Sequence, residues 1–372
     1  MSLSRNALRA RLALVVVAAL AMALMVGPAA ASAHKRGHDR SDRELTVMTQ
    51  NLYLGSDLNP ALAATTPTEF LTAVAQIYGT VQFTNFPARA QAIANEIKKQ
   101  KPDLVGLQEV SKWTAAGVVG TPPSYDFLTI LQSALTARGL DYEVASVADN
   151  ALIGPVPLAG LNGCSAAPPF TCQVTLQDRD VILVNKKTHD LKWSNPASGR
   201  YAAQATVNTP VGPLSFDRGW TRIDVKYRGK SFKFANTHLE VEGPTAPIQE
   251  AQAQEFLAGP ASGRNTLATG DFNSAADGST TLSYGYLTAP GKFDDAWDES
   301  ELGPGYSCCQ NSTLTNFPPS LTSRIDLILT RGNVESDGDD AELIGATPFQ
   351  AAPPLYPSDH AGVVADVEID NH

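Results

Sequence analysis

Short runs of apolar residues, many of them alternating with polar ones, recur along the 372 residues of this chain. Alternation with a period of two is typical of a strand with one buried face, and a short unbroken apolar run is typical of a fully buried strand. The pattern therefore predicts a protein rich in strands. They cover residues 45–51, 104–110, 180–185, 201–207, 221–227, 231–239, 265–270, 324–330 and 362–369.

Two segments between these strands have a helical periodicity instead. One begins at Pro87 and ends before Pro102, and the other runs from Thr245 to Gly259. Apolar residues recur on one face of each segment: Ala90, Ile93, Ala94 and Ile97 in the first, and Ile248, Ala251, Ala253 and Leu257 in the second.

The order of these elements predicts an α/β fold with layered sheets. Strands 221–227 and 231–239 are separated only by the residues RGK, which predicts an antiparallel hairpin and a sheet that is not purely parallel. Helices covering the faces of the sheets would give an α/β sandwich. The segments 154–171 and 303–320 are rich in Gly, Pro and Ser and predict long surface loops.

The N-terminus has the features of a secretory signal peptide. Residues 1–33 contain three arginines, then the apolar run from Leu12 to Val26, then small residues that end in Ala31-Ser32-Ala33. The apolar run is shorter than the roughly 20 residues that a membrane-spanning helix needs. We therefore expect a secreted, extracellular protein with a flexible mature N-terminus at 34–44 and one domain at 45–369.

The cysteines fit an oxidising compartment. Their number is even, four, which predicts structural disulfide bonds in an exported protein. Cys164 and Cys172 flank a short segment that a disulfide closes easily, whereas Cys308 and Cys309 are adjacent and could pair only as a vicinal disulfide. Neither spacing matches the C-x2-C pattern of a zinc site.

Polar residues of the kinds used in catalysis stand at the ends of many predicted strands. Any one of them has a structural explanation, such as an Asn or Asp in a turn or a hydrogen-bonded histidine in the core. Their repeated position at strand ends favours a shared site at the edge of a sheet. The set is Asn51, Glu109, His238, Asp271, Asn273, Asp326, Asp359 and His360.

The ordered motifs TQNLY, LQEV, NTHLE, GDFNS, SRIDLIL and SDHAGV span residues 45–369. This set resembles the endonuclease/exonuclease/phosphatase superfamily, which includes pancreatic deoxyribonuclease, abasic-site endonucleases, inositol polyphosphate phosphatases and bacterial sphingomyelinases. The resemblance implies a four-layer α/β/β/α sandwich with two mixed β-sheets, a divalent metal and hydrolysis of a phosphate ester.

The chemistry of phosphodiester hydrolysis assigns a role to each of these residues. Glu109 is a hard oxygen ligand suited to Mg²⁺, Mn²⁺ or Ca²⁺, Asn51 is expected to orient metal-bound water, and Asp359 is expected to reach the metal through water or to bind a second ion. Asp271 is expected to orient or deprotonate the nucleophile. Asn273 lies two residues further on, faces the same way and would donate to the developing negative charge.

Two histidines remain as groups that transfer a proton or contact the phosphate. A histidine works as a general acid or base only when an acidic partner fixes its tautomer. The resemblance supplies Asp326 as the partner of His360, and Asp178 is the candidate partner of His238.

Net charge bears on the substrate. Removing residues 1–33 takes away three arginines and no acid, which changes the formal net charge from −10 to −13. An acidic surface disfavours a polynucleotide and favours a phospholipid or sphingolipid headgroup diester, with transient contact with membrane lipid. An extracellular deoxyribonuclease-like endonuclease, which would bind nucleic acid, is the alternative.

Other classes of protein fit less well. The sequence contains no H-E-x-x-H motif for a zinc hydrolase and no G-x-S-x-G motif for a serine hydrolase. A non-catalytic, secreted Ca²⁺-binding module would gather its acids in a D-x-[DN]-x-[DN]-G loop, whereas the acids here are scattered over distant strand ends. No feature of the sequence indicates an obligate protein partner.

Overall fold

The computed structural model describes residues 43–117, 122–161, 163–298, 303–336 and 341–370. The predicted signal peptide, residues 1–33, and all but the last two residues of the predicted flexible segment 34–44 lie outside these ranges, so both stay predictions. None of the helices in the described ranges is long and apolar enough to cross a membrane.

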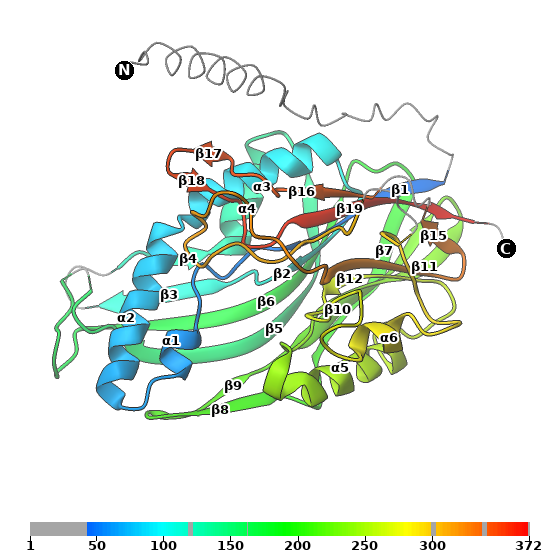
Figure 1. Cartoon of the computed structure of the whole chain (residues 1–372). Coiled ribbons are helices and arrows are strands. Elements are labelled where there is room, and N and C mark those ends of the chain that lie inside the picture. The colour runs from blue at the N-terminus through cyan, green and yellow to red at the C-terminus, as the bar shows by residue number, and fades with distance from the viewer. Residues whose placement is uncertain (1–42, 118–121, 162, 299–302, 337–340, 371–372) are drawn as a thin grey trace, which may run out of the picture. The chain divides into compact units, whose positions relative to one another are not determined.

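Two mixed sheets form the centre of the fold (Figure 1). The strands β1 and β2 are parallel in one sheet and β11 and β12 in the other, and the remaining described pairs are antiparallel. The larger sheet has the order β15 (Val334–Ser336), β19 (Gly362–Ile369), β1 (Glu44–Asn51), β2 (Leu104–Gln108), β6 (Cys172–Asn185), β3 (Lys112–Gly117) and β4 (Tyr125–Asp126), with β16 (Glu342–Ile344) also on β19 and β5 (Tyr142–Pro157) also on β6. The smaller sheet has the order β13 (Asp294–Asp295), β14 (Asp326–Arg331), β12 (Thr266–Asp271), β11 (Lys230–His238), β10 (Gly219–Tyr227) and β7 (Leu191–Arg200).

Helices cover the outer face of each sheet. Side chains of α2 (Pro67–Phe83), α3 (Phe86–Gln100) and α4 (Phe127–Thr136) share a core with the larger sheet. Side chains of α5 (Ala246–Ala258) and α6 (Ser283–Leu287) share another core with the smaller sheet. A third core fills the space between the two sheets. The predicted α/β/β/α layering is confirmed.

The shorter elements lie around these layers. The helix α1 (Asn59–Leu62) precedes α2, and the 3-10 helix η1 (Gly243–Thr245) precedes α5. Two small ribbons pair β8 (Ala205–Thr209) with β9 (Gly212–Phe216), and β17 (Gln350–Ala351) with β18 (Pro354–Leu355). The segment 303–323 has no helix and no strand, as predicted, apart from single bridges at Cys308.

The helix α3 shows how the sequence sets local structure. Asn85 caps its first turn by accepting a hydrogen bond from Ala88 N, and Pro87 stands in the first turn, where a missing N–H costs nothing. The helix ends at Gln100, and the C-cap residue Lys101 has a left-handed backbone with φ of 53°. The predicted apolar face is buried against the larger sheet: Ala90, Ile93, Ala94 and Ile97.

Two predictions about elements are only partly right. Of the predicted strand 201–207, residues 205–207 belong to β8 and pair with β9, whereas residues 201–204 are not in a strand. The predicted apolar face of α5 is also only partly right. Ala253 is buried as predicted, but Ala251 is exposed, and the buried face also contains two glutamines, Gln249 and Gln252.

The sulfur atoms of all four cysteines are paired. Cys164 and Cys172 form the predicted disulfide, with an S–S distance of 2.07 Å, and close the loop that follows β5. Cys308 and Cys309 are joined to each other.

Candidate active site

The eight predicted site residues come together because of strand direction. Asn51 ends β1, and Glu109 follows the parallel strand β2. Asp359 and His360 precede β19, which runs antiparallel to β1, so that its beginning lies at the same edge of the sheet. The same rule gathers the remaining residues at one edge of the smaller sheet.

In the smaller sheet three of these residues form a row across neighbouring strands. His238 is paired with Asp271 in the parallel ladder of β11 and β12. Asp271 is paired in turn with Asp326 in the antiparallel ladder of β12 and β14. The backbone therefore fixes the spacing of two carboxylates and an imidazole before any side chain is considered.

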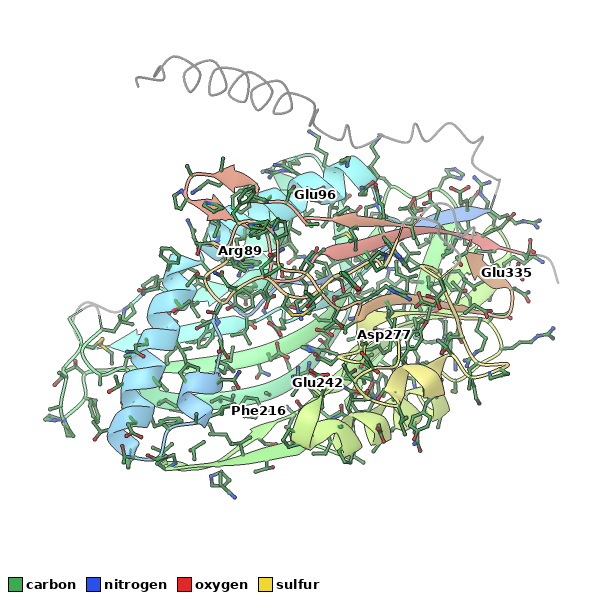
Figure 2. All side chains as sticks on the ribbon, in the orientation of Figure 1. Arg89, Glu96, Phe216, Glu242, Asp277 and Glu335 are labelled. Carbon is green, nitrogen blue, oxygen red and sulfur yellow. A yellow bond between two sulfur atoms is a disulfide. The ribbon has the colours of Figure 1, made fainter. Side chains whose placement is uncertain are left out.

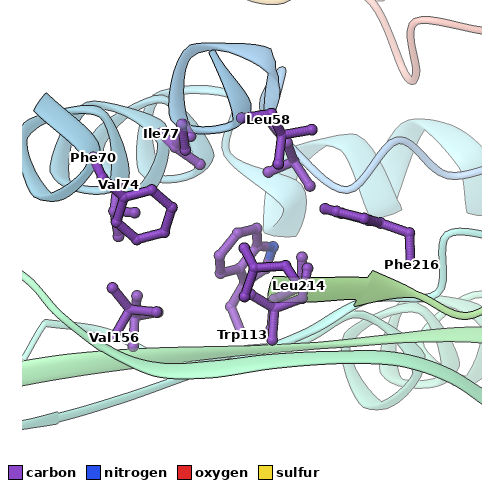
Figure 3. A pocket seen from close by; sticks show the side chains of 13 residues that line it. Leu58, Phe70, Val74, Ile77, Trp113, Val156, Leu214 and Phe216 are labelled. Atoms are coloured by element: carbon purple, nitrogen blue, oxygen red, sulfur yellow. The ribbon is translucent and has the colours of Figure 1, made fainter. Parts of the chain in front are cut away.

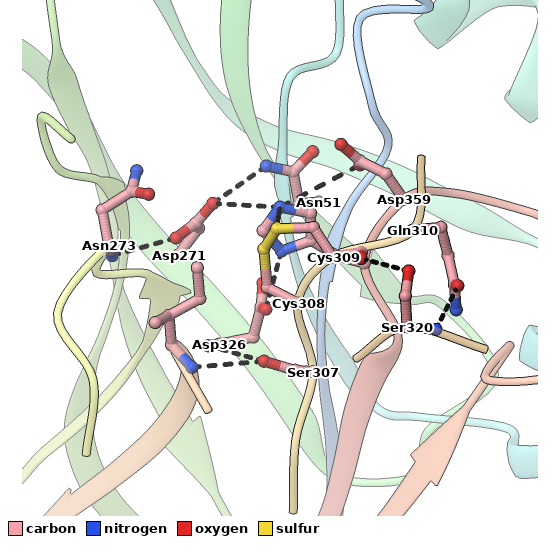
Figure 4. Close-up of a disulfide and its surroundings, with 12 residues drawn as sticks. Asn51, Asp271, Asn273, Ser307, Cys308, Cys309, Gln310, Ser320, Asp326 and Asp359 are labelled. Atoms are coloured by element: carbon pink, nitrogen blue, oxygen red, sulfur yellow. Dashed lines mark hydrogen bonds and ion pairs between the residues drawn. A yellow bond between two sulfur atoms is a disulfide. The ribbon is translucent and has the colours of Figure 1, made fainter. Parts of the chain in front are cut away.

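Asp271 is held from several directions (Figure 4). Its Oδ2 accepts a hydrogen bond from Asn51 Nδ2 at 3.0 Å, and its Oδ1 accepts one from the backbone N–H of Asn273 at 3.0 Å. Its Oδ2 also lies 3.4 Å from His238 Nε2 and 3.8 Å from His360 Nε2. Burial raises the pKa of Asp271 to about 6, against the opposing effect of His360. A carboxylate so placed can accept a proton near neutral pH.

His360 is a buried histidine with an acidic partner. Its Nδ1 lies 2.8 Å from Asp326 Oδ2, which fixes the ring and leaves Nε2 directed toward Asp271 and, at 4.0 Å, toward Asp359. Burial alone would lower the pKa of His360, but the carboxylates of Asp326, Asp359 and Asp271 outweigh it and raise the pKa well above its ordinary value. His360 is thus set up to carry a proton at Nε2.

His238 has the opposite character. Asn273 Nδ2 lies 3.0 Å from its Nε2, and Arg218 Nη1 lies 3.0 Å from its Nδ1 and 3.1 Å from its Nε2. Both groups are donors, so a ring nitrogen must accept and the ring is neutral. Burial and then the positive charge of Arg218 lower the pKa of His238 well below its ordinary value. The two histidines of the site therefore differ in charge because their neighbours differ.

The predicted pairing of Asp178 with His238 is wrong, because the hydrogen bonds of Asp178 go to other residues. Asp178 lies in the same cluster, but its carboxylate oxygens contact Asn150 at 3.3 Å and Ser111 at 3.5 Å. The acid at ion-pair distance from His238 is Asp271. Asp178 comes from the middle of β6 rather than from a strand end, so its side chain is directed by the ladder and not by a turn.

Arg218 is a site residue that the sequence analysis did not single out. It lies between β9 of the small ribbon and β10 of the smaller sheet, is partly buried, and reaches Glu240 at 3.6 Å as well as His238. Burial lowers its pKa, but Glu240, Asp178 and other acids raise it overall, so the guanidinium stays charged. The sequence around Arg218 could not show this, because the acids near its side chain come from other segments of the chain.

Glu109 and Asp359 form the side of the site that could hold a metal ion. Glu109 Oε2 accepts a hydrogen bond from Leu54 N at 2.6 Å. Burial raises the pKa of Asp359 to about 7, and Glu109 contributes to the rise. Burial and Asp178 raise the pKa of Glu109 in the same way. Carboxylates that oppose each other's ionisation in this way suit a hard divalent cation, so the donor set fits Mg²⁺, Mn²⁺ or Ca²⁺.

Supporting residues hold the loops of the site in place. Arg89 of α3 (labelled in Figure 2) is fully buried and donates to the carbonyl oxygens of Leu52, Tyr53 and Pro357. These carbonyls belong to the segments that carry Asn51 and Asp359. Gln249 of α5 likewise donates to backbone carbonyl oxygens of loops that carry site residues.

The glutamines on the buried face of α5 explain its unusual composition. Gln249 Nε2 donates to the carbonyl oxygens of Glu240 at 2.6 Å and Asn273 at 2.7 Å. Gln252 accepts from Glu240 N at 2.8 Å. Each buried amide thereby satisfies backbone groups of the loops that follow β11 and β12, which positions Asn273.

The described residues also line an apolar pocket apart from these glutamines (Figure 3). It has about 50 Å³ of space and lies between α1 and α2, the larger sheet and β9. Trp113 in its wall donates from Nε1 to Leu54 O at 2.8 Å, and Leu54 N is the group that donates to Glu109. The pocket and the acidic side of the site therefore share the segment that contains Leu54. Its lining includes Leu58, Phe70, Val74, Ile77, Val156, Leu214 and Phe216.

Residues 48–360 match the Endonuclease/Exonuclease/phosphatase family. The chain belongs to the endonuclease/exonuclease/phosphatase family. Members of this family are hydrolases that act on phosphoester bonds and typically use a divalent metal. No curated protein sequence matches the chain.

Solved structures of this family share the fold. An endonuclease/exonuclease/phosphatase family protein from Bacteroides thetaiotaomicron has a TM-score of 0.54 at 18% identity, covering 88% of this chain and 98% of its own. The B. thetaiotaomicron mannosyl-6-phosphatase has a TM-score of 0.50 at 19% identity, with 87% and 99% covered. A humanised D. rerio TDP2 has a TM-score of 0.50 at 14% identity, with 87% and 99% covered. At these identities the likeness establishes the fold.

Proposed function

We propose that this chain is a secreted, divalent-metal-dependent phosphodiesterase whose substrates are phospholipid or sphingolipid headgroup diesters. The observation that carries the phosphodiesterase assignment is the position of Asp271. It lies between a neutral His238 and a positively charged His360, and it accepts a hydrogen bond from Asn51.

Each group has a step that it can perform. A bound Mg²⁺ or similar ion supplies Lewis-acid polarisation of the phosphoryl oxygen, and Glu109, Asp359 and Asn51 would hold it. Asp271 orients the attacking water and takes its proton. Arg218 donates hydrogen bonds to the charge that develops on the phosphoryl oxygens. Asn273, which was expected to do so, has its Nδ2 committed to His238 Nε2 and to Leu239 O at 3.0 Å each, so it positions that ring instead.

His360 completes the reaction at the leaving group. A proton at Nε2, stabilised through Nδ1 by Asp326, can pass to the departing oxygen as its bond to phosphorus breaks. Asp271 holds the proton taken from the attacking water while His360 gives its proton to the leaving oxygen, so the total charge of the site does not change. Asp271 then loses its proton to solvent, and His360 takes one up from solvent, which restores the starting state.

Two observations support an amphiphilic substrate. The mature chain's formal charge of −13 disfavours a long polyanion. The apolar pocket beside Leu54 offers a place for an apolar group of the substrate, although at about 50 Å³ it holds a short segment and not a whole acyl chain. Export through the predicted signal peptide is part of the same proposal, because headgroup diesters of membranes are then accessible from outside the cell.

The experiment that tests the proposal compares substrates with one enzyme batch at matched Mg²⁺ and low salt. The substrates are vesicles of sphingomyelin or phosphatidylcholine, duplex DNA, bis(p-nitrophenyl) phosphate and p-nitrophenyl phosphate, the last because one structural neighbour is a phosphatase. We expect hydrolysis of both diester probes and of the vesicles, with the monoester and DNA turned over more slowly.

A pair of variants separates this activity from contamination. Asp271→Ala should lose roughly 10²–10⁴-fold in rate, because it removes a positioned base. Asp277→Ala changes an exposed carboxylate six positions away, labelled in Figure 2, and should keep the wild-type rate. Efficient cleavage of DNA by the wild type but not by Asp271→Ala, with vesicles untouched, would show that the endonuclease alternative is correct.

A further inference from the structure

The adjacent cysteines 308 and 309 lie in the wall of the site described above (Figure 4). The backbone of Cys308 forms single β-bridges with Ser323 and with His360, which places the pair beside the histidine. Cys309 is exposed, and its Sγ lies 3.9 Å from His360 Nε2. Both sulfur atoms and that ring nitrogen lie within 4.8 Å of one another.

These three atoms form a donor set unlike the rest of the site. Thiolate sulfur and imidazole nitrogen suit soft or borderline cations such as Zn²⁺ and Cd²⁺, whereas Glu109, Asp359 and Asn51 offer the oxygen atoms that hard cations prefer. His360 also has the usual arrangement of a metal ligand. Its Nδ1 is 2.8 Å from Asp326 Oδ2, and a carboxylate on the far ring nitrogen orients metal-binding histidines.

We propose that Cys308, Cys309 and His360 form a second metal site, which exists only when the disulfide is reduced and which binds one soft divalent cation. A dithiol or phosphine reductant supplies the two electrons that break the S–S bond, and each sulfur takes up a proton. Binding of the cation then releases the two thiol protons, and the Nε2 proton where the ring is charged, to solvent. In the oxidised protein neither sulfur is a thiolate, so the site is absent.

A cation bound at this second site should block hydrolysis because of the position of His360 Nε2. That nitrogen is the one directed toward Asp271 at 3.8 Å and Asp359 at 4.0 Å, and it cannot both bind a cation and transfer a proton. Reduction in the presence of Zn²⁺ or Cd²⁺ should therefore stop hydrolysis. This consequence rests on the proposed function, whereas the metal site itself does not.

The test uses Cd²⁺ and the mature full-length protein. Wild type and a Cys308→Ser/Cys309→Ser variant are reduced with a phosphine, freed of it under nitrogen and titrated with Cd²⁺, while the ultraviolet cadmium–thiolate absorption is followed and bound metal is counted. Cys164 and Cys172 are present in both proteins, so the difference isolates the adjacent pair. We expect one additional thiolate-bound Cd²⁺ in reduced wild type and none in oxidised wild type.

A third variant tests the part played by the histidine. Asp326→Asn removes the carboxylate that orients His360 and should weaken Cd²⁺ binding on the order of 10–100-fold without abolishing the thiolate absorption. Equal thiolate-bound Cd²⁺ in reduced wild type and in the double-serine variant, or none in either, would overturn the inference. Hydrolysis of bis(p-nitrophenyl) phosphate in Mg²⁺ is measured on the same samples. Its absence in every sample would refute the proposed function while the binding result still decides the metal site.

Discussion

Two buried carboxylates set the charge of the groups around them. Asp271 and Asp326 are neighbours in one sheet row, yet Asp326 has its Oδ2 committed to His360 Nδ1 while Asp271 is bound by amide donors. Asp326 thus stabilises a positive imidazole, and Asp271, whose pKa burial raises to about 6, is left as the base. The difference between two residues of the same type comes entirely from their partners.

The raised pKa of Asp271 predicts the acid side of the pH profile. The carboxylate accepts a proton only when it is charged, so kcat/KM should fall as the pH drops below about 6. An ordinary aspartate, with a value of 3.8, would place that fall more than two units lower. Initial rates on bis(p-nitrophenyl) phosphate across the acidic range, at saturating metal, distinguish the two. A fall near the ordinary value would exclude Asp271 as the base.

Asp326→Asn should move the alkaline side of the same profile. His360 donates a proton, so activity is lost as the pH rises through its pKa, and Asp326 is the largest of the charges that raise that pKa. Without this carboxylate the loss should begin at lower pH. At the pH optimum of the wild type, the rate of the variant should approach that of an enzyme without its general acid, a loss of roughly 10²–10⁴-fold. A uniformly lowered profile with an unshifted alkaline side would indicate that Asp326 has only a structural role.

Among the elements, β2 shows how closely the two sheets approach behind the site. Gly106 in the middle of this strand has no Cβ, and one placed there would overlap Thr269 Oγ1 and the side chain of Asn236 from the opposite sheet. Asn236 in turn accepts a hydrogen bond from Gln108 Nε2 at 2.6 Å and donates to Leu107 O at 3.1 Å. The glycine therefore makes room for a buried polar layer between the sheets.

Gly106→Ala should destabilise the protein by about 1–3 kcal/mol, because overpacking a well-filled interior forces side chains from their rotamers. The matched control is Gly285→Ala in α6, where a Cβ meets nothing within 4 Å and no positive φ is required. That change should be neutral or slightly stabilising. Chemical denaturation of both variants is the measurement. Equal midpoints for Gly106→Ala and wild type would mean that the sheets can separate at this point at no cost.

For the molecule as a whole, the described site is richer in acids than in bases. Seven carboxylates lie in or beside it, opposed by Arg89, Arg218 and the positively charged His360. The acids are Glu109, Asp178, Asp180, Asp271, Asp326, Asp359 and Glu240. A divalent cation would reduce this imbalance, so its removal should affect both chemistry and stability.

Metal removal therefore gives a prediction for the whole protein. EDTA should abolish hydrolysis of bis(p-nitrophenyl) phosphate, and Mg²⁺, Mn²⁺ or Ca²⁺ should restore it, because the oxygen donors suit these ions. The melting temperature should rise on adding the metal back, in proportion to the logarithm of its concentration above Kd. Undiminished turnover in the chelator would refute the metal mechanism.

Much of the candidate site could be read from the residues. Strand ends are marked by local patterns, and Asn51, His238 and Asp271 each end a strand in a way that the period-two alternation already indicates. The ordered motifs resemble one superfamily, and that resemblance then predicted the α/β/β/α layering of the fold. These inferences succeed because the positions of strand ends depend on sequence neighbours.

The contacts between distant segments depended on the tertiary structure. Arg218 is a loop residue in sequence, and it becomes part of the site only because β10 pairs with β11 and brings it beside His238. The face of α5 was predicted only in part for the same kind of reason, because Gln249 is buried and binds carbonyl groups of two loops that follow other strands. The alternation of apolar residues along the chain determines which segments become strands and where they end. Which polar side chains meet, and which charge each histidine carries, is decided by the burial and partners that only the packed sheets supply.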